Sequence, residues 1–263
     1  MRFYLGTHQV CWLERTDVPL FISHRRLQAY KRLPRARGQW ALDSGGFTEL
    51  SMHGEWTVSP HEYVVAVRRY MGEVGGLQWA AIQDWMCEPF ITAKTLPTTP
   101  NDMAVSWHQS LTVESYLTLS HLAPEVPWAP VIQGWRPRDY FGHVEMYDKA
   151  GIDLRALPIV GVGSVCRRQD TSTAAHLFRS LGRMGIKTHG FGVKTQGLEV
   201  YGQDIASADS MAWSFAARRR QIRLKGCTHK TCANCMRWAL RWRADMLGKV
   251  GTRTSAQVDL FYR

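Results

Sequence analysis

The sequence predicts an α/β protein that folds as a (β/α)8 barrel. Eight short apolar runs rich in Val, Ile and aromatic residues recur along the chain, each bounded by turn residues. Helical patterns fall between most of these runs, which favours a closed parallel barrel over an open sheet. Several runs also end abruptly in a polar side chain, and parallel α/β folds place such residues together, outside the carboxyl ends of the strands.

The expected strands follow one another from the N-terminus to Asp209. They cover residues 3–6, 19–22, 40–43, 79–84, 129–134, 159–163, 188–192 and 205–209. The first two connections between strands are short, whereas most of the later ones contain a helical pattern.

The clearest helix start is Ser59-Pro60-His61-Glu62, a capping box with proline at the first helical position. Apolar side chains follow it at helical spacing, namely Tyr63, Val64, Val67 and Tyr70. Further helices are expected over residues 102–121, 137–150 and 171–184, and a basic helix over 236–247.

Length and composition limit the class of protein. A chain of 263 residues with 45% hydrophobic content can bury one full core, with or without a small appendage. No apolar run is long enough to predict a membrane span, and the N-terminus lacks the features of a secretory signal. Three of the six cysteines crowd together near the C-terminus, which favours a metal site in a reducing, cytoplasmic compartment over a disulfide scaffold. The net charge of +11 suggests a polyanionic partner.

Four of the expected strand ends carry polar groups that would converge at the mouth of a barrel. They are Asp43, Asp84, Gln133 and Asp209, with glycines nearby at Gly45, Gly46, Gly134, Gly161 and Gly163. Three carboxylates, an amide and close-approaching backbone predict a polar pocket. Any one of these residues has an alternative role in capping a helix or holding a loop, and Asp209 opens a helical segment as an N-cap would.

The motifs at these positions resemble a known family. Leu42-Asp43-Ser44-Gly45-Gly46-Phe47, Val131-Ile132-Gln133-Gly134 and Ala208-Asp209-Ser210 are similar to motifs of the tRNA-guanine transglycosylases. More narrowly, the chain resembles their DNA-modifying relatives, which insert 7-deazaguanine bases into DNA. The resemblance runs from Leu42 to Cys235, and it implies a zinc-bearing (β/α)8 barrel.

The resemblance also implies a role for each matching residue. Asp209 corresponds to the nucleophile that attacks C1′ of the nucleotide, and Asp43 to the general acid/base. Phe47 corresponds to an aromatic side chain that stacks on the base, the alternative being a core residue under the loop. The full set of base-binding residues implied in this way is Ser44, Phe47, Asp84, Gln133, Gly134, Gly161, Gly163 and His189.

The chemistry that the resemblance implies is physically reasonable. A C1′ that loses its base becomes cation-like, and a carboxylate beside it can capture it as an ester. Because guanine is stacked inside a duplex, the enzyme must first take the nucleotide out of the stack.

Three departures from the tRNA enzymes favour DNA as the substrate. The chain is shorter and shows no additional RNA-binding domain. The context of Asp84, Asp-Trp-Met-Cys-Glu-Pro, differs from the usual continuation in those enzymes. Residues 164–168, Ser-Val-Cys-Arg-Arg, resemble the DNA-modifying branch more closely.

The cysteine-rich segment has the spacing of a zinc knuckle. Cys227-x-His229-x-x-Cys232-x-x-Cys235 offers a Cys3His set of the kind that tetrahedral zinc accepts. No position is left for water, so we expect the zinc to be structural. The alternatives are free surface thiols, or Cys166 or Cys11 in place of His229.

Basic side chains on both sides of the knuckle are candidates for phosphate contacts. They are Arg218, Arg219, Arg220, Arg223, Lys225, Arg237 and Arg241. Such a run is often only a solvated helix face, but the net charge favours nucleic acid. We expect Trp238 and Trp242 to pack the knuckle onto the barrel.

We therefore expect a glycosyltransferase that replaces guanine in DNA with a free 7-deazaguanine, such as 7-cyano-7-deazaguanine. Residues 1–217 would form the catalytic barrel, and residues 218–263 a basic zinc-binding subdomain with a C-terminal helix. Two alternatives stay open. One is the same chemistry on tRNA, and the other is a non-catalytic, zinc-bearing nucleic-acid-binding subunit, against which the presence of both Asp43 and Asp209 argues.

Overall fold

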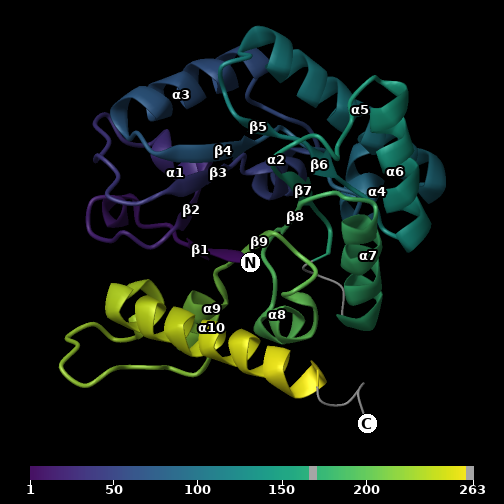
Figure 1. The fold of residues 1–263 in the computed structure, drawn as a ribbon. Coiled ribbons are helices and arrows are strands. Elements are labelled where there is room, and N and C mark those ends of the chain that lie inside the picture. The colour runs from purple at the N-terminus through teal and green to yellow at the C-terminus, as the bar shows by residue number, and fades with distance from the viewer. Residues whose placement is uncertain (166–170, 259–263) are drawn as a thin grey trace.

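A computed structural model describes residues 1–165 and 171–258, with side chains up to residue 250. Strands and helices alternate around a parallel barrel, as Figure 1 shows. The strands are β1 Arg2–Gly6, β2 Leu20–Ser23, β3 Trp40–Asp43, β4 Leu77–Ala81, β5 Trp128–Ala129, β6 Val131–Ile132, β7 Val160–Val162, β8 Thr188–Gly190 and β9 Ser207–Ser210. The predicted (β/α)8 class is confirmed, and each expected strand overlaps an observed one.

The fifth expected strand is divided into β5 and β6 by Pro130. The hydrogen-bonded order is β5-β4-β3-β2-β1-β9-β8-β7-β6, so the two halves of this strand are the two ends of the sheet. Proline has no backbone N–H to donate, which interrupts the ladder at this position. Its carbonyl still accepts a 2.8 Å hydrogen bond from Gly161 N, and the sheet is thereby nearly closed into a barrel.

The helices lie on the outside of the barrel. They are α1 His24–Leu27, α2 Gly46–His53, α3 Pro60–Glu73, α4 Pro89–Thr95, α5 Asn101–Leu122, α6 Pro137–Lys149, α7 Thr171–Arg183, α8 Thr195–Tyr201, α9 Ala212–Arg219 and α10 Met236–Val258. The capping box predicted at the start of α3 is present, with the side chains and backbone groups of Ser59 and Glu62 bonded reciprocally.

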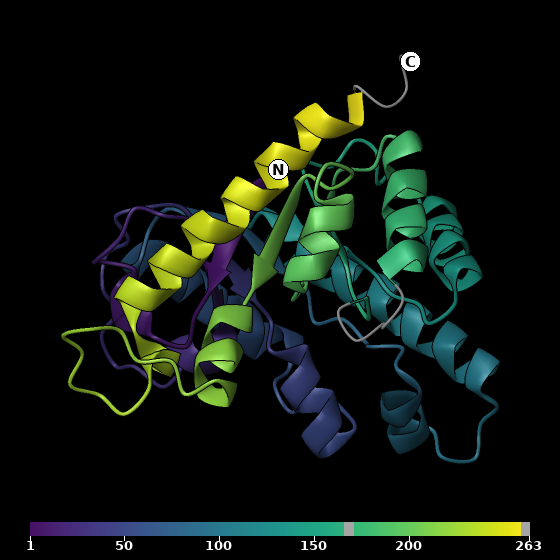
Figure 2. The ribbon, with the colours of Figure 1, turned by 90° about the horizontal axis from the view of Figure 1, so that it is seen from below.

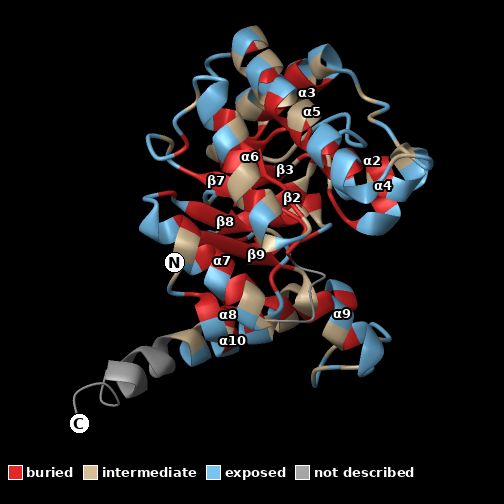
Figure 3. Cartoon of the chain, turned by 90° about the vertical axis from the view of Figure 1, so that its right-hand side faces the viewer, coloured by how far each residue is buried: buried red, intermediate tan, exposed pale blue. Residues whose placement is uncertain are grey.

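The barrel has a core in its interior, and the helices pack around the outside of its strands. Buried aromatic and small side chains fill its interior, namely Tyr4, Phe21, Ala41, Trp79, Ala81, Ala129 and Ile159. The strands are almost entirely buried, whereas the helices expose their outer faces, as Figure 3 shows. None of the helices in the described residues is both long and apolar enough to cross a membrane.

The C-terminal helix covers the part of the barrel where the early connections supply little helix. Only a short 3-10 turn follows β1, and α1 after β2 has four residues. Helix α10 instead lies across this side (Figure 2), where Arg243 Nη2 donates to the carbonyl of Phe3 at 3.4 Å. As expected, the two tryptophans face the barrel: Trp238 Nε1 donates to Trp213 O at 2.9 Å, and Trp242 packs against Phe3.

Candidate active site

A pocket of about 240 Å³ opens at the carboxyl ends of the strands. Four of the predicted strand-end residues line it together: Asp43, Asp84, Gln133 and Asp209. They are far apart in the sequence, and the parallel barrel brings them to one mouth. In Figure 2, helices α2 and α4 project from this end of the barrel, as do α9 and the cysteine-rich loop.

Asp43 ends β3 and lies where the chain turns sharply into α2. Its Oδ1 accepts a 3.2 Å hydrogen bond from the backbone N–H of Gly45, which has a φ of 85° that glycine adopts without strain. Burial raises the pKa of Asp43, and the nearby charge of Asp209 raises it further, against hydrogen bonds from Gly45 and Ser23. The protonated form of Asp43 is therefore more accessible than in water.

Asp209 lies on β9 and is held through one of its two oxygens. Gly192 N donates to Oδ1 at 2.8 Å, and His189 Nε2 lies 3.4 Å from the same atom. Within the described residues, no hydrogen bond to Oδ2 is present. One carboxylate oxygen is thus fixed while the other is available to the pocket that Asp209 lines.

His189 lies beneath the pocket and does not line it. Its side chain is fully buried inside the barrel, among the rings of Tyr4, Phe21 and Trp79. Its Nδ1 is 2.8 Å from Ser207 Oγ, and burial lowers its pKa. A neutral ring that accepts from Ser207 at Nδ1 carries its proton at Nε2, where it can donate to Asp209.

Asp84 and Gln133 form one wall of the pocket. Gln133 Nε2 donates to the Asp84 carboxylate, and burial raises the pKa of Asp84 to about 7. Gly163 packs directly against the Gln133 amide, where any added Cβ would overlap it. A larger residue at this position would displace the amide from the wall.

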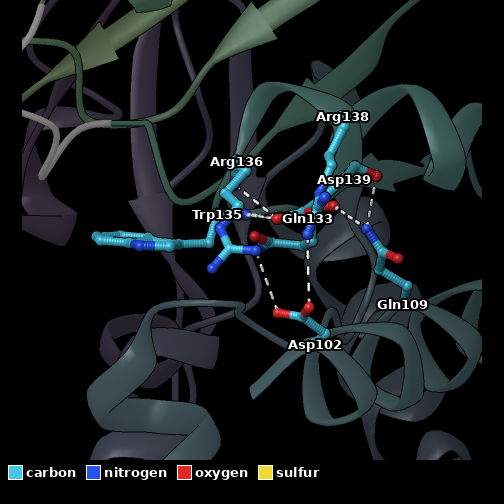
Figure 4. Close-up of polar contacts among 7 residues, drawn as sticks. All are labelled: Asp102, Gln109, Gln133, Trp135, Arg136, Arg138 and Asp139. Carbon is cyan, nitrogen blue, oxygen red and sulfur yellow. Dashed lines mark hydrogen bonds and ion pairs between the residues drawn. The ribbon is translucent and has the colours of Figure 1, made fainter. Parts of the chain in front are cut away.

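The backbone of Gln133 is fixed from behind by helices α5 and α6. Gln109 Nε2 donates to the carbonyls of Gln133 and Asp139, at 2.7 and 2.8 Å. Asp139 Oδ2 in turn accepts from Arg136 N at the start of α6. Figure 4 shows these contacts, together with the ion pairs that join Asp102 to Arg136 and Arg138.

The remaining predicted base-binding residues occupy different places. Phe47 lines the pocket at its rim and is 39% exposed, with its ring 6.3 Å from that of Phe90 on α4. Ser44 is buried and is not part of the pocket lining. Gly134 faces α6, and Gly161 faces the ring of Phe191, so neither lines the pocket.

Sequence reasoning missed several lining residues. Ser164 lines the pocket with a φ of 57°, and Phe191, Gly192 and Met211 line it beside Asp209. Glu88 lies behind this wall, 2.7 Å from the Ser164 hydroxyl. Glu88 and Ser164 fall within the two segments, residues 84–89 and 164–168, that distinguish the chain from the tRNA enzymes, but their places in the pocket wall depend on loop conformation, which sequence patterns do not signal.

The four predicted knuckle residues do come together. One ligand atom from each of Cys227, His229, Cys232 and Cys235 lies within 4.8 Å of the others, so the cluster could hold a metal ion. The Sγ atoms of Cys227 and Cys235 are 4.0 Å apart, close to the edge of about 3.8 Å of a tetrahedral zinc–thiolate site. Cys11 is not part of this cluster, and Cys166 lies outside the described residues, as do Arg167 and Arg168.

The basic residues near the knuckle divide into two groups. Arg237 Nη2 donates to Cys227 Sγ at 3.1 Å, and Arg223 Nε to Cys227 O at 3.0 Å, so both support the knuckle loop. The other predicted phosphate-binding residues, Arg218, Arg219, Arg220, Lys225 and Arg241, are exposed.

A parallel barrel with three carboxylates lining one pocket at the carboxyl ends of its strands has the arrangement typical of enzymes built on this fold. The model of the family DpdA, described as deoxypurine in DNA protein A, matches residues 1–259. The chain belongs to this family of DNA 7-deazaguanine transglycosylases, which are relatives of the tRNA-guanine transglycosylases. A comparison with the curated proteins found no match.

Proposed function

We propose that the protein replaces guanine in DNA with a free 7-deazaguanine through an ester between Asp209 and C1′. The observation that carries this proposal is the one-sided support of Asp209. Two donors hold Oδ1, whereas no hydrogen bond to Oδ2 is present within the described residues, so we assign Oδ2 as the attacking atom. Because Gly192 N and His189 are already in place, the carboxylate needs little reorganisation before attack.

Two displacements at C1′ complete the exchange. In the first, Asp209 Oδ2 forms a bond to C1′ while the bond to N9 of guanine breaks, and the leaving base takes the proton of Asp43. In the second, the Asp43 carboxylate accepts the N9 proton of the incoming 7-deazaguanine, whose N9 attacks C1′ and releases Asp209. Two inversions give net retention at C1′, and Asp43 ends protonated as it began.

The raised pKa of Asp43 supports its part in this sequence. Burial and the charge of Asp209 favour the neutral form that must donate first. Asp84, Gln133 and Phe47 line the pocket, which supports roles for Asp84 and Gln133 in hydrogen-bonding the edge of the base and for Phe47 in covering its face.

The substrate proposal is DNA rather than tRNA. Family membership supports DNA as the polymer that is modified. The family also argues against a non-catalytic binding subunit, as does the pairing of Asp43 with Asp209 in one pocket.

We further propose that the knuckle holds a structural zinc ion and that residues 218–263 form a basic subdomain on the barrel. The donor set is one that zinc accepts, and all four positions of a tetrahedral site would be filled by protein. When bound, the ion would fix the loop that carries Arg223 and Lys225 close to the mouth. The exposed arginines of α9 would then contact the DNA backbone.

A base-exchange assay tests the proposed function. Purified protein is incubated with labelled guanine and with either duplex DNA, single-stranded DNA or bulk tRNA. We expect label to enter DNA in the wild type and none to enter with Asp209→Asn. Label that enters tRNA alone would contradict the choice of DNA, and label that enters neither polymer would contradict the transglycosylase reaction itself.

A further inference from the structure

Four buried side chains form a continuous row along one wall of the pocket. Glu88 and Ser164 are 1% and 2% exposed, and Gln133 is fully buried. Ser164 Oγ lies 2.7 Å from Glu88 Oε2 and 2.7 Å from Gln133 Oε1. Gln133 Nε2 then reaches the carboxylate of Asp84, which completes the row Glu88–Ser164–Gln133–Asp84.

Ser164 is held at the centre of this row by its backbone. Its φ of 57° is uncommon for a residue other than glycine, and such conformations concentrate at functional sites. Cys87 N also donates to Ser164 Oγ, at 3.2 Å. The hydroxyl group therefore already accepts one hydrogen bond and has a single proton to give.

That single proton cannot serve both of its neighbours. If Ser164 donates to Gln133 Oε1, it has no proton left for Glu88. The contact between Ser164 Oγ and Glu88 Oε2 is then a hydrogen bond only when the Glu88 carboxyl group is protonated and donates. If Ser164 donates to Glu88, the Gln133 amide must turn its NH2 group toward Ser164. Gln133 Oε1 then faces Asp84, which must supply the proton instead.

The hydrogen bonds along the row are thus satisfied by one proton on either carboxyl group. In one arrangement Glu88 is neutral and Asp84 is an acceptor. In the other Asp84 is neutral and Glu88 is an acceptor. If both carboxyl groups are ionised, two neighbouring oxygen atoms in the row are in contact with no proton between them. Such a contact is energetically unfavourable in a buried site of low dielectric constant.

We propose that Glu88 and Asp84 hold one proton between them, and that its position decides which base edges the pocket accepts. This rests on the proposed function, because it concerns the base that enters that pocket. With the proton on Glu88, the wall presents an anionic acceptor at Asp84. With the proton on Asp84, the wall is neutral there and can present an O–H donor.

A wall that can change between acceptor and donor would be useful in the exchange reaction. Guanine carries an acceptor nitrogen at position 7, whereas a 7-deazaguanine carries carbon and a substituent there, and both bases must occupy the same pocket. A base that binds one arrangement better shifts the population toward it. In that shift one O–H bond breaks and the other forms by proton exchange with water, and the row as a whole gains or loses no proton.

Two isosteric substitutions favour opposite arrangements of the row. Glu88→Gln supplies an NH2 group that can donate to Ser164, which favours Asp84 as the acceptor. Asp84→Asn supplies an NH2 group that can donate to Gln133 Oε1, which favours Glu88 as the acceptor. Ser164→Ala removes the hydroxyl group that links Glu88 to Gln133, and the two carboxyl groups should then titrate independently.

Calorimetry with guanine and with 7-cyano-7-deazaguanine measures the consequence for recognition. We expect Glu88→Gln and Asp84→Asn to change the ratio of the two affinities in opposite directions, each by roughly tenfold or more. The reason is that a base bound to the arrangement it does not match leaves a buried polar group without a hydrogen bond. A ratio that moves the same way in both variants, or does not move, would overturn the role in recognition.

The shared proton itself is measured by titrating the carboxyl carbon signals in the ¹³C NMR spectrum of the full chain. Near neutral pH we expect one of the two groups to be protonated in the wild type, and Asp84 to be ionised in Glu88→Gln. Glu49 is the internal reference: it is also buried, but hydrogen bonds from Thr57 and the charge of Arg25 outweigh burial and lower its pKa.

Wild-type spectra with Asp84 and Glu88 both ionised at the pH where Glu49 is ionised would contradict the shared proton. This measurement requires neither catalysis nor a bound base. Failure of the exchange reaction and failure of the shared proton are therefore distinguishable.

Discussion

His189 Nε2 lies 3.4 Å from Oδ1 of Asp209, inside the barrel and below the floor of the pocket. The histidine is fully buried, and its other nitrogen is occupied by the hydroxyl of Ser207. Its ring therefore touches Asp209 without reaching the space that a base or a nucleotide would enter. This places His189 as a positioning residue for the carboxylate.

Loss of the imidazole should slow the reaction without unfolding the barrel. We expect His189→Phe to lower kcat by roughly 10- to 100-fold, because the variant lacks the hydrogen bond that orients Asp209 while the aromatic packing is largely kept. Ser207→Ala, which only removes the group that fixes the tautomer, should have a smaller effect. Steady-state kinetics with circular dichroism as a check on folding measure both, and an unchanged kcat in His189→Phe would remove the positioning role.

Burial raises the pKa of Asp84 to about 7, so the stability of the folded protein should change with pH in a predictable direction. An unfolded aspartate loses its proton near pH 3.9, whereas the folded protein keeps it to about pH 7, so the folded state binds more protons between these values. Asp84 therefore makes the protein less stable as the pH rises through this window. Asp84→Asn should gain stability relative to the wild type as the pH increases.

Thermal denaturation of the wild type and Asp84→Asn from about pH 5 to about pH 8 measures this difference. The difference in Tm in favour of the variant should grow across the range. A difference that is constant with pH would mean that Asp84 is ionised throughout this range and that any proton held by the row is on Glu88.

The sequence predicted the part of the site that depends on regular structure. Asp43, Asp84, Gln133 and Asp209 all follow apolar runs, and the strand ends of a parallel barrel share one mouth, so their meeting could be expected. The division of the fifth strand at Pro130 follows from the missing N–H of proline and changes only the strand count.

The remainder depends on geometry that no periodic pattern encodes. Ser164 reaches the pocket because its backbone adopts a positive φ, and Glu88 reaches Ser164 from another loop. His189 was expected against the base, but the pleat of β8 turns its side chain into the barrel interior. The docking of α10 beside β1 joins opposite ends of the chain, which local sequence signals do not reveal.

The cysteine–histidine cluster should bind one metal ion that stabilises the fold. We expect purified protein to contain about one zinc, and Cys232→Ala to lose most of it and to lower Tm by roughly 5 °C or more. Cys11→Ala is the matched control, because Cys11 lies outside the cluster. Elemental analysis and thermal denaturation measure the two effects, and protein prepared without chelators that contains no metal would contradict the assignment.

The exposed arginines of α9 should bind phosphates rather than bases. Each arginine removed from a phosphate should make the dependence of log K on log salt shallower by about 0.9 for duplex DNA. We expect this of Arg218→Ala and Arg219→Ala, with a similar decrease in affinity for unrelated DNA sequences. Arg155, which pairs with Asp148 and Asp153, provides the control substitution. Slopes equal to those of the wild type and of Arg155→Ala would place the DNA on another surface.

The most direct test of the proposed mechanism is to identify the atom that carries the nucleotide during exchange. Wild-type protein is quenched with acid during turnover on a guanine-containing DNA oligonucleotide, digested and analysed by mass spectrometry. We expect a nucleotide ester on the peptide that contains Asp209, and neither adduct nor exchange in Asp209→Asn, which keeps the shape of the side chain but is a poor nucleophile. Exchange at a near wild-type rate by Asp209→Asn, or an adduct on another residue, would contradict the mechanism.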